Sequence, residues 1–446
     1  MRKFIAPKFF QTVLSVSLTF IFIVTFTNFG FSQSGKLKVT YQEGEDFFQS
    51  EDYKEAIYYF LQLEQNGYIN SNIQFKIGTC YLNIPGEEVK AIPYLQEAVK
   101  HITNKYRTKD LSERKAPLHS LFFLGNVYRI NNQLDKALEA YDKFIKSPDY
   151  DGNYNLNIVE LEIKACERAK IIQDSPIDVV WHNSGEPINT ASSETYPALS
   201  GDGKVMAYLT SLKFYNAIYV TRKFEGKWQV SENINPQILS DGDFYPTALS
   251  YDGSELYLVK KSISNSDIYV SVLKDGKWSA AKALNENINS SKNETYAAIT
   301  ADNKILYFAS NRHGGRGGYD IYKSVKDKNN DWGKAENLGK SINTKLDDIS
   351  PSITLDGKTL YFSSKGHYNM GGFDIFISTT TDDKKWSLPV NIGYPVNTTN
   401  DNIGFQVIGE GKSGYISRIA PDGFGKEDIY EVEIKSHFIQ KLSVEE

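Results

Sequence analysis

A short motif that recurs five times at an almost constant spacing constrains the fold of this chain more than any other feature. Each copy has a small or acidic residue, then Ile, then Tyr or Phe, and the copies start at Ala217, Asp267, Asp320, Asp374 and Asp428. The successive spacings are 50, 53, 54 and 54 residues, and a Trp follows the motif in four of the units. A chain with this period is built from five copies of one structural unit.

Tight turns indicate how each unit divides into strands. An Asp-Gly pair, the strongest short signal for a hairpin, stands upstream of the motif at residues 202–203, 252–253 and 356–357. Each unit then holds four short strands in about 50 residues, which is the size of a propeller blade. The repeat therefore predicts a five-bladed all-β propeller over residues 177–435.

The segments after each Trp predict how the ring closes. Two of them end in Ile-Asn-Thr or Val-Asn-Thr, at residues 342–344 and 396–398, and Ile-Asn-Thr also precedes the first unit at residues 188–190. The last unit has no such ending, so we expect residues 177–181 to supply the outer strand of the last blade and to hide unpaired edges. In its motifs and spacing this region resembles the WD-like β-propeller repeats of TolB-type periplasmic proteins.

A shorter repeat lies before the propeller. Gly44 and Gly125 are each followed by an aromatic residue at +3, Ala at +12 and an aromatic residue at +16, and Gly78 heads a third unit that shifts by one residue. Small residues at these points let two helices approach closely. The spacing resembles the tetratricopeptide repeat, whose period is about 34 residues. We expect an N-terminal α-helical solenoid of this type over residues 37–176, closed by a helix at 157–173, in an α + β multidomain chain.

A solenoid of this kind has a concave groove that can hold a partner. Counted from the Gly of each first helix, the groove-facing positions are aromatic and polar, which suits a peptide. The groove residues that we single out are Tyr41, Glu45, Phe75, His119, Phe122, Asn126 and Arg129. The alternative is that three repeats form a small packed bundle.

The loops between the second and third strands of the blades are the other candidate binding surface. All five should emerge on one face of the ring, and three of them are rich in Gly and in basic or aromatic residues. A basic patch on a chain with a net charge of −5 runs against the overall charge. It predicts a carboxylate-bearing partner held by Arg312, His313, Arg316, Lys365, His367, Tyr368 and Arg418. The alternative is that these loops are only flexible connectors.

The repeated acids are interpreted as architectural. Asp202 and its equivalents stand in turns, where Asp bonds its own backbone, and Asp320 and its equivalents are expected to cap backbone amides. A glycosidase would need two specific carboxylates that face one cleft. The six His residues have no paired metal-ligand spacing, and no nucleophile elbow, Walker loop or zinc-protease helix occurs. We therefore expect no catalytic residues, no metal, no cofactor and no enzyme activity.

The first 32 residues have the pattern of a secretory signal peptide. Basic residues precede an apolar run, and Gly30 and Ser32 fit the small positions of a cleavage site. The alternative is an uncleaved anchor, since residues 12–31 are long enough to span a bilayer. No Cys lies near residue 32, which excludes a lipid anchor, and the acidic chain is not expected to bind nucleic acid. Residues 436–446 are expected to form a C-terminal tail.

The order of these parts resembles the front of a cell-envelope protein family from Bacteroidetes-type bacteria. Full-length members continue into a peptidoglycan-binding OmpA-like domain, and some belong to type IX secretion or gliding machinery. This chain stops at Glu446, so that domain is missing from it. Our first hypothesis is a non-catalytic scaffold, periplasmic or associated with the outer membrane, that binds protein partners of the envelope. The alternatives are a glycan-binding or glycan-processing propeller and a membrane-tethered signalling sensor.

Overall fold

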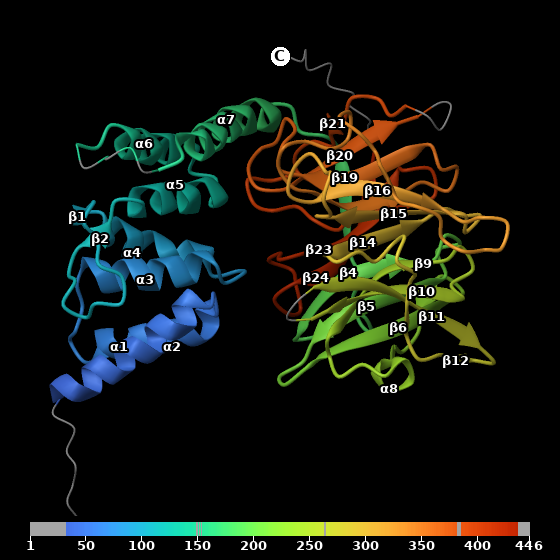
Figure 1. Cartoon of the computed structure of the whole chain (residues 1–446), viewed down its shortest axis with the longest axis horizontal. Coiled ribbons are helices and arrows are strands. Elements are labelled where there is room, and N and C mark those ends of the chain that lie inside the picture. The colour runs from blue at the N-terminus through green and yellow to red at the C-terminus, as the bar shows by residue number, and fades with distance from the viewer. Residues whose placement is uncertain are drawn as a thin grey trace, which may run out of the picture.

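The fold comes from a computed structural model of the chain, shown in Figure 1. It describes residues 33–435 apart from residues 149, 151, 153, 263–264 and 381–384. The predicted signal peptide (residues 1–32) and the tail (residues 436–446) lie outside the described residues. None of the helices in the described ranges combines the length and the apolar character needed to cross a bilayer.

Three antiparallel helix pairs and a seventh helix form the N-terminal part, which we call the helical array (Figure 1). Asp52 and Asn70 begin the second and third helices, because each side chain accepts a hydrogen bond from the backbone N–H three residues further on. The helices are α1 Gln33–Gln49, α2 Tyr53–Gln65, α3 Ser71–Leu82, α4 Ala91–Ala98, α5 Ser120–Ile130, α6 Leu134–Ile145 and α7 Leu156–Gln173. A 3-10 turn, η1 Glu88–Lys90, precedes α4.

The predicted close approach within each helix pair is confirmed. A Cβ atom on Gly44 would lie 3.0 Å from Cβ of Tyr59, and one on Gly78 would lie 2.7 Å from Cγ of Leu95. At Gly125 it would overlap the ring of Tyr141. The helical architecture is therefore as expected, while membership of the tetratricopeptide family stays a prediction.

The five-bladed propeller is also present, and its strand order repeats from blade to blade. Blade one consists of β4 Ser193–Leu199, β5 Val205–Ser211, β6 Asn216–Phe224, β7 Lys227–Trp228 and β8 Glu232–Asn233. Blade two consists of β9 Phe244–Leu249, β10 Glu255–Lys261, β11 Ser266–Lys274, β12 Lys277–Trp278 and β13 Lys282–Ala283. A short helix, α8 Asn235–Ile238, lies between these two blades. Blades three and four are β14 Glu294–Ile299, β15 Ile305–Ser310, β16 Asp320–Val325 and β17 Glu336–Asn337, then β18 Asp348–Ile353, β19 Thr359–Ser364, β20 Asp374–Thr379 and β21 Val390–Asn391.

The last blade closes the ring as predicted. It consists of β22 Gln406–Ile408, β23 Ser413–Arg418, β24 Asp428–Ile434 and, as the outer strand, β3 Val179–Asn183 from the start of the propeller. β3 runs antiparallel to β24, with Val179 opposite Ile434 and Asn183 opposite Tyr430. The strand therefore begins two residues later than the sequence indicated.

The Asn of each Ile-Asn-Thr segment has a role that sequence analysis missed. In blade four, the side-chain oxygen of Asn397 accepts from the backbone N of Ile375, and its nitrogen donates to the carbonyl of the same Ile, both at 2.8 Å. Asn343 and Asn189 hold the Ile residues of blades three and five in the same way. We call this pair of hydrogen bonds between an Asn side chain and the backbone of an Ile a clasp. Each clasp attaches the connection that leads to the next blade to the third strand of the blade before it.

The expected roles of the repeated Asp residues are confirmed in the turns and at three of the four strand positions, while Asp267 accepts from the side chain of Asn265 instead of a backbone N–H. Asp320, Asp374 and Asp428 accept hydrogen bonds from backbone N–H groups of the loop before them. Asp202 and Asp356 accept from the N–H two residues further on in their turns, both at 3.0 Å. These carboxylates stabilise loops and turns.

The propeller presents two different faces. The loops between the second and third strands, at residues 211–216, 262–266, 310–320, 364–374 and 418–428, form what we call the loop face. The turns between the first and second strands form the opposite, hairpin face. In Figure 1 the helical array lies on the side of the loop face.

Candidate functional site

The helical array covers the part of the loop face that belongs to blades four and five. Arg129, at the end of α5, donates to the carbonyl of Thr399, whose hydroxyl donates to the carbonyl of Ile130 at 3.3 Å. Met370, from the blade-four loop, is fully buried in the hydrophobic core of the helical array. These contacts join the two parts, and among the described loop residues, 213–215 of blade one and 313–318 of blade three stay exposed.

The predicted loop-face residue Arg312 serves its own blade. Its guanidinium lies 3.1 Å from the buried carboxylate of Glu294, donates to the carbonyl of Ile288, and stacks on the rings of Phe308 and Tyr322 at 5.1 and 5.0 Å. A partner could bind this group only by breaking these contacts. The geometry therefore favours a stabilising role for Arg312.

His367 occupies the equivalent place in blade four. Its Nε2 lies 2.8 Å from the carbonyl of Ile342, and its ring contacts Phe362 and Phe376. Burial lowers the pKa of His367, so the neutral ring is favoured. In blade five Arg418 stacks on Trp181, with the guanidinium 4.1 Å from the ring centroid. Each side chain covers the aromatic residues of one blade.

The other four predicted loop residues divide between the covered and the open regions. Tyr368 lies under Arg168 of α7, 4.6 Å from the guanidinium, and is part of the contact with the helical array. Lys365 lies 3.9 Å from Asp347 and is 40% exposed at its side chain. His313 and Arg316 are exposed on the open blade-three loop, where Nε of Arg316 also donates to the carbonyl of Asn343 at 3.0 Å. The predicted convergence of all seven residues on one patch is not what the structure shows.

The open region has an aromatic component that sequence analysis missed. Phe214 and Tyr215, in the blade-one loop, are 86% and 47% exposed, and Lys213 Nζ lies 5.1 Å from the ring of Phe214. Two adjacent exposed aromatic residues in a loop between strands were a usable signal, because soluble proteins rarely expose them without function. His313 and Arg316 lie on the blade-three loop of the same face, and we refer to the exposed residues of these two loops together as the open patch.

The predicted groove residues of α1 and α3 are buried. Glu45 forms an ion pair with Lys76 at 2.5 Å, and both side chains are 2% exposed. Tyr41 is buried beside them, and burial raises the pKa of its phenol. Phe75 is buried against Phe123. These groups line the groove, but other parts of the chain cover them.

The groove residues at α5 are half-buried and pack against neighbouring side chains. His119 packs edge-on against Phe75, and burial lowers the pKa of its ring to about 4. Phe122 packs on Phe144 of α6, and Asn126 accepts a hydrogen bond from the hydroxyl of Tyr141 at 2.8 Å. At this end of the groove the predicted residues therefore have partners within the chain and keep part of their surface exposed.

Arg129 is the predicted groove residue with the clearest other role. It is buried, its Nε lies 2.7 Å from the carboxylate of Glu162 in α7, and it reaches the propeller at Thr399. It therefore joins α5, α7 and blade five.

A concavity of about 590 Å³ remains at the N-terminal end of the groove. Its walls are α1 and residues 109–112, and Tyr41 and Glu45 lie among its lining residues. Polar and charged groups of both signs line it, with Lys38 and Asp46 on α1. Of the predicted groove, this part is open to a ligand.

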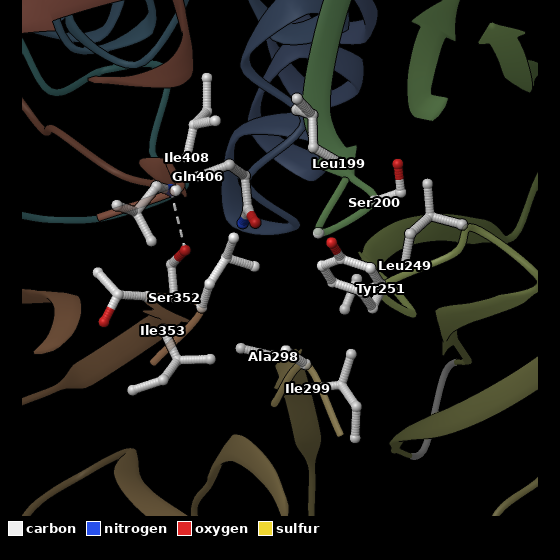
Figure 2. Close-up of a pocket in the computed structure, with 17 residues that line it drawn as sticks. Leu199, Ser200, Leu249, Tyr251, Ala298, Ile299, Ser352, Ile353, Gln406 and Ile408 are labelled. Carbon is white, nitrogen blue, oxygen red and sulfur yellow. Dashed lines mark hydrogen bonds between the residues drawn. The ribbon is translucent and has the colours of Figure 1, made fainter. Parts of the chain in front are cut away.

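The centre of the propeller ring opens on the hairpin face into a narrow pocket of about 50 Å³, shown in Figure 2. The last residues of the inner strands, Leu199, Leu249, Ile299, Ile353 and Ile408, are among its lining residues, and their side chains pack outward between the blades. This volume is far below the roughly 300–1,000 Å³ of an ordinary ligand pocket.

The inner strands begin with acidic residues at the loop face, but each is held inside its own blade. Glu194 accepts from Thr190, Glu294 pairs with Arg312, and Asp348 accepts from Ser364 at 2.5 Å. Burial raises the pKa of Asp348 to about 7. Each of these carboxylates is therefore hydrogen-bonded or ion-paired within its own blade. The two carboxylates of a glycosidase, in contrast, face a single cleft. Among the described residues no three His, Cys, Asp or Glu side chains gather as a metal site.

Comparisons with known proteins add little to this picture. No protein-family model and no curated protein matches the chain. Among solved structures, TolB from Agrobacterium tumefaciens is 17% identical with a TM-score of 0.34, over 54% of this chain and 74% of that chain. TolB from Acinetobacter baumannii is 16% identical with a TM-score of 0.34, over 64% and 72%. The catalytic domain of a GH62 α-L-arabinofuranosidase from Coprinopsis cinerea is 11% identical with a TM-score of 0.40, over 58% and 98%. At this level of similarity the matches carry no argument about what this chain does.

Proposed function

We propose that the protein is a non-catalytic scaffold that binds an acidic protein partner through the open patch of its loop face. The observation that carries this proposal is the pairing of exposed aromatic with exposed cationic side chains at this patch. Phe214 and Tyr215 supply apolar area, and Lys213 and Arg316 supply positive charge. Interfaces draw most of their binding energy from such aromatic and Arg residues.

Charge supports an acidic partner. The chain as a whole carries −5, so a cationic region on its surface runs against the overall charge and favours the approach of a negative surface. Lys261 and Lys345 lie at the same face and are exposed. Attraction between exposed charges is screened by salt, so binding should weaken as ionic strength rises.

The rigid attachment of the helical array supports the scaffold part of the proposal. The buried contacts of Arg129 and Met370 hold the array against the loop face, which is the face that also carries the open patch. The secretory pattern of residues 1–32 places this activity in the periplasm or at the outer membrane in our proposal. The groove of the helical array is a second surface and is treated below.

The test is crosslinking and affinity purification from the envelope fraction with three baits. These are the unchanged protein, the double variant Phe214→Ala with Arg316→Ala, and a matched control, Phe224→Ala with Arg222→Ala. The control residues are exposed in the same blade but toward the hairpin face. The patch variant should lose the partner by about 10-fold or more, while the control keeps it and both remain folded. Equal capture by the patch variant and the unchanged protein would contradict the proposal.

A further inference from the structure

A loop of the helical array lies in the groove that was predicted for a partner. This loop, residues 104–115, which we call the strap, runs between β1 Ile102–Thr103 and β2 Ala116–Pro117. β1 and β2 pair in parallel, so the two ends of the strap are held side by side. Loops of this compact form, with close ends, are frequently functional.

The backbone of the strap is held by a groove residue. Asn72, in the first turn of α3, is fully buried; its backbone N–H donates to the carbonyl of Arg114, and its side-chain nitrogen donates to the carbonyl of Glu113, both at 3.2 Å. An amide side chain that binds main-chain carbonyls can hold an extended segment of any sequence. The groove therefore already holds a peptide, and that peptide is part of the same chain.

One side chain of the strap enters the groove. The hydroxyl of Tyr106 donates to the side-chain oxygen of Asn72 at 2.5 Å, and its ring packs edge-on against Phe75 at 6.2 Å. Burial raises the pKa of the Tyr106 phenol. Tyr68, from the turn before α3, donates to the carbonyl of Leu111. The groove thus offers a place for one tyrosine and several donors for backbone carbonyls.

The strap keeps its shape largely through its own contacts. The carboxylate of Glu113 accepts from the backbone N–H groups of Arg114 and Lys115, both at 3.0 Å, and lies 3.3 Å from Nε of Arg107. The strap is also a wall of the concavity of about 590 Å³, whose opposite wall is α1. If the strap left the groove, the concavity and the space filled by Tyr106 would join.

From these contacts we infer that the groove is a peptide-binding site, that its ligand is a peptide segment carrying a tyrosine, and that the strap occupies the site as an intramolecular ligand. A partner peptide would bind there by taking the places of Tyr106 and of the carbonyls of Glu113 and Arg114. This site is separate from the open patch, and it does not depend on the function proposed for that patch.

The inference is tested with a peptide that has the sequence of residues 104–115, labelled with a fluorophore. The protein, residues 33–446, is prepared unchanged and with residues 105–113 replaced by a Gly-Ser segment of equal length. The replaced protein should bind the peptide at least about 10-fold more tightly than the unchanged protein does, since the unchanged groove is occupied. A peptide with Tyr106→Ala should bind about 10-fold or more weakly.

Failure to fold is handled by a second variant. Tyr106→Ala in the otherwise unchanged protein keeps the strap and removes its anchor, and it should increase hydrogen exchange over residues 104–115 and allow the labelled peptide to bind. A folded variant that binds no peptide, or equal binding by the unchanged and replaced proteins, would overturn the inference. Neither variant should alter partner capture by the open patch, so the two proposals fail separately.

Discussion

Replacing Arg129 tests whether the helical array and the propeller are one folding unit. The guanidinium is buried and has two partners, the carbonyl of Thr399 at the contact with blade five and the carboxylate of Glu162 in α7. Arg129→Ala would leave the carboxylate of Glu162, 22% exposed at its side chain, without its cation, and the carbonyl of Thr399 without its donor. The substitution therefore acts on the contact between the two parts as well as on the array itself.

The size of the effect follows from these contacts. Removing one partner of a buried ion pair costs about 3–5 kcal/mol, and partial exposure of Glu162 places this pair near the lower end. At about 2–4 °C per kcal/mol for a domain of the array's size, a loss of about 3 kcal/mol lowers the melting temperature of the array by roughly 6–12 °C. The propeller should melt close to its original temperature, because its own strands and clasps are unchanged.

Two probes separate the two parts. All five Trp residues lie in the propeller, so Trp fluorescence reports on the propeller, while far-ultraviolet circular dichroism at the helical minimum reports mainly on the array. In the unchanged protein the two transitions should coincide, and in Arg129→Ala the helical transition should come first. The control is Lys143→Ala, which removes a cation from an exposed pair in α6 and should change neither transition. Coincident and unshifted transitions in Arg129→Ala would refute the view that Arg129 joins the two parts.

Three further predictions concern the interior of each part. Asn397→Ala leaves the buried N–H of Ile375 unpaired, at about 1–3 kcal/mol, while the carbonyl of Ile375 keeps the N–H of Ile392 as its donor. Chemical unfolding followed by Trp fluorescence should show a loss of at least about 1 kcal/mol, and a smaller loss would argue against the clasp. Gly125→Ala places a methyl group in the ring of Tyr141, so the free energy of unfolding of the helical array should fall by about 1–3 kcal/mol. The helical circular dichroism should then be lost at a lower temperature, and an unchanged melting curve would contradict this. Burial raises the pKa of Asp374 to about 8, above the ordinary value of about 3.9. Its contribution to stability is then complete below about pH 4 and is lost as the pH rises toward 8. Asp374→Asn should flatten the dependence of the unfolding free energy on pH over this range, and identical slopes in the two proteins would disprove the assignment.

The architecture could be predicted because residues with the same structural role recur at the same position of each repeat. Asp320 and its equivalents stand at a fixed spacing before a strand, which only a repeated capping role explains, and the structure confirms it. Gly125 stands where two helices touch, and its place in the repeat was visible for the same reason. The closing strand β3 could be predicted because the Ile-Asn-Thr segment that is absent after Tyr430 is present before the first blade, at residues 188–190.

The binding surfaces could be predicted only in part, because equivalent positions carry different residue types. Arg312 and His367 both cover the aromatic residues of a blade and both bind a carbonyl of the preceding connection, yet one is Arg and the other His, displaced by one residue in the repeat. The repeated Asp residues could be recognised in the sequence because the residue type is the same in each unit, whereas Arg312 and His367 differ in type and in position. The contact of Met370 with the helices joins segments more than 200 residues apart, and no local pattern shows such a contact.

The way in which β3 enters the last blade also sets how the propeller responds to tension. Val179 and Ile434 are paired, so the chain enters and leaves the ring at the same end of one ladder. A force that pulled residues 178 and 435 apart would load the hydrogen bonds of that ladder one pair at a time, as in opening a zipper. The contact between Arg129 and Thr399 connects the helical array to the propeller independently of the ladder between β3 and β24. A force applied at the N-terminal end of the array therefore acts on this contact before it acts on the ladder. Pulling the ends in a single-molecule experiment should therefore give a higher first rupture force when the array is present than when it is absent.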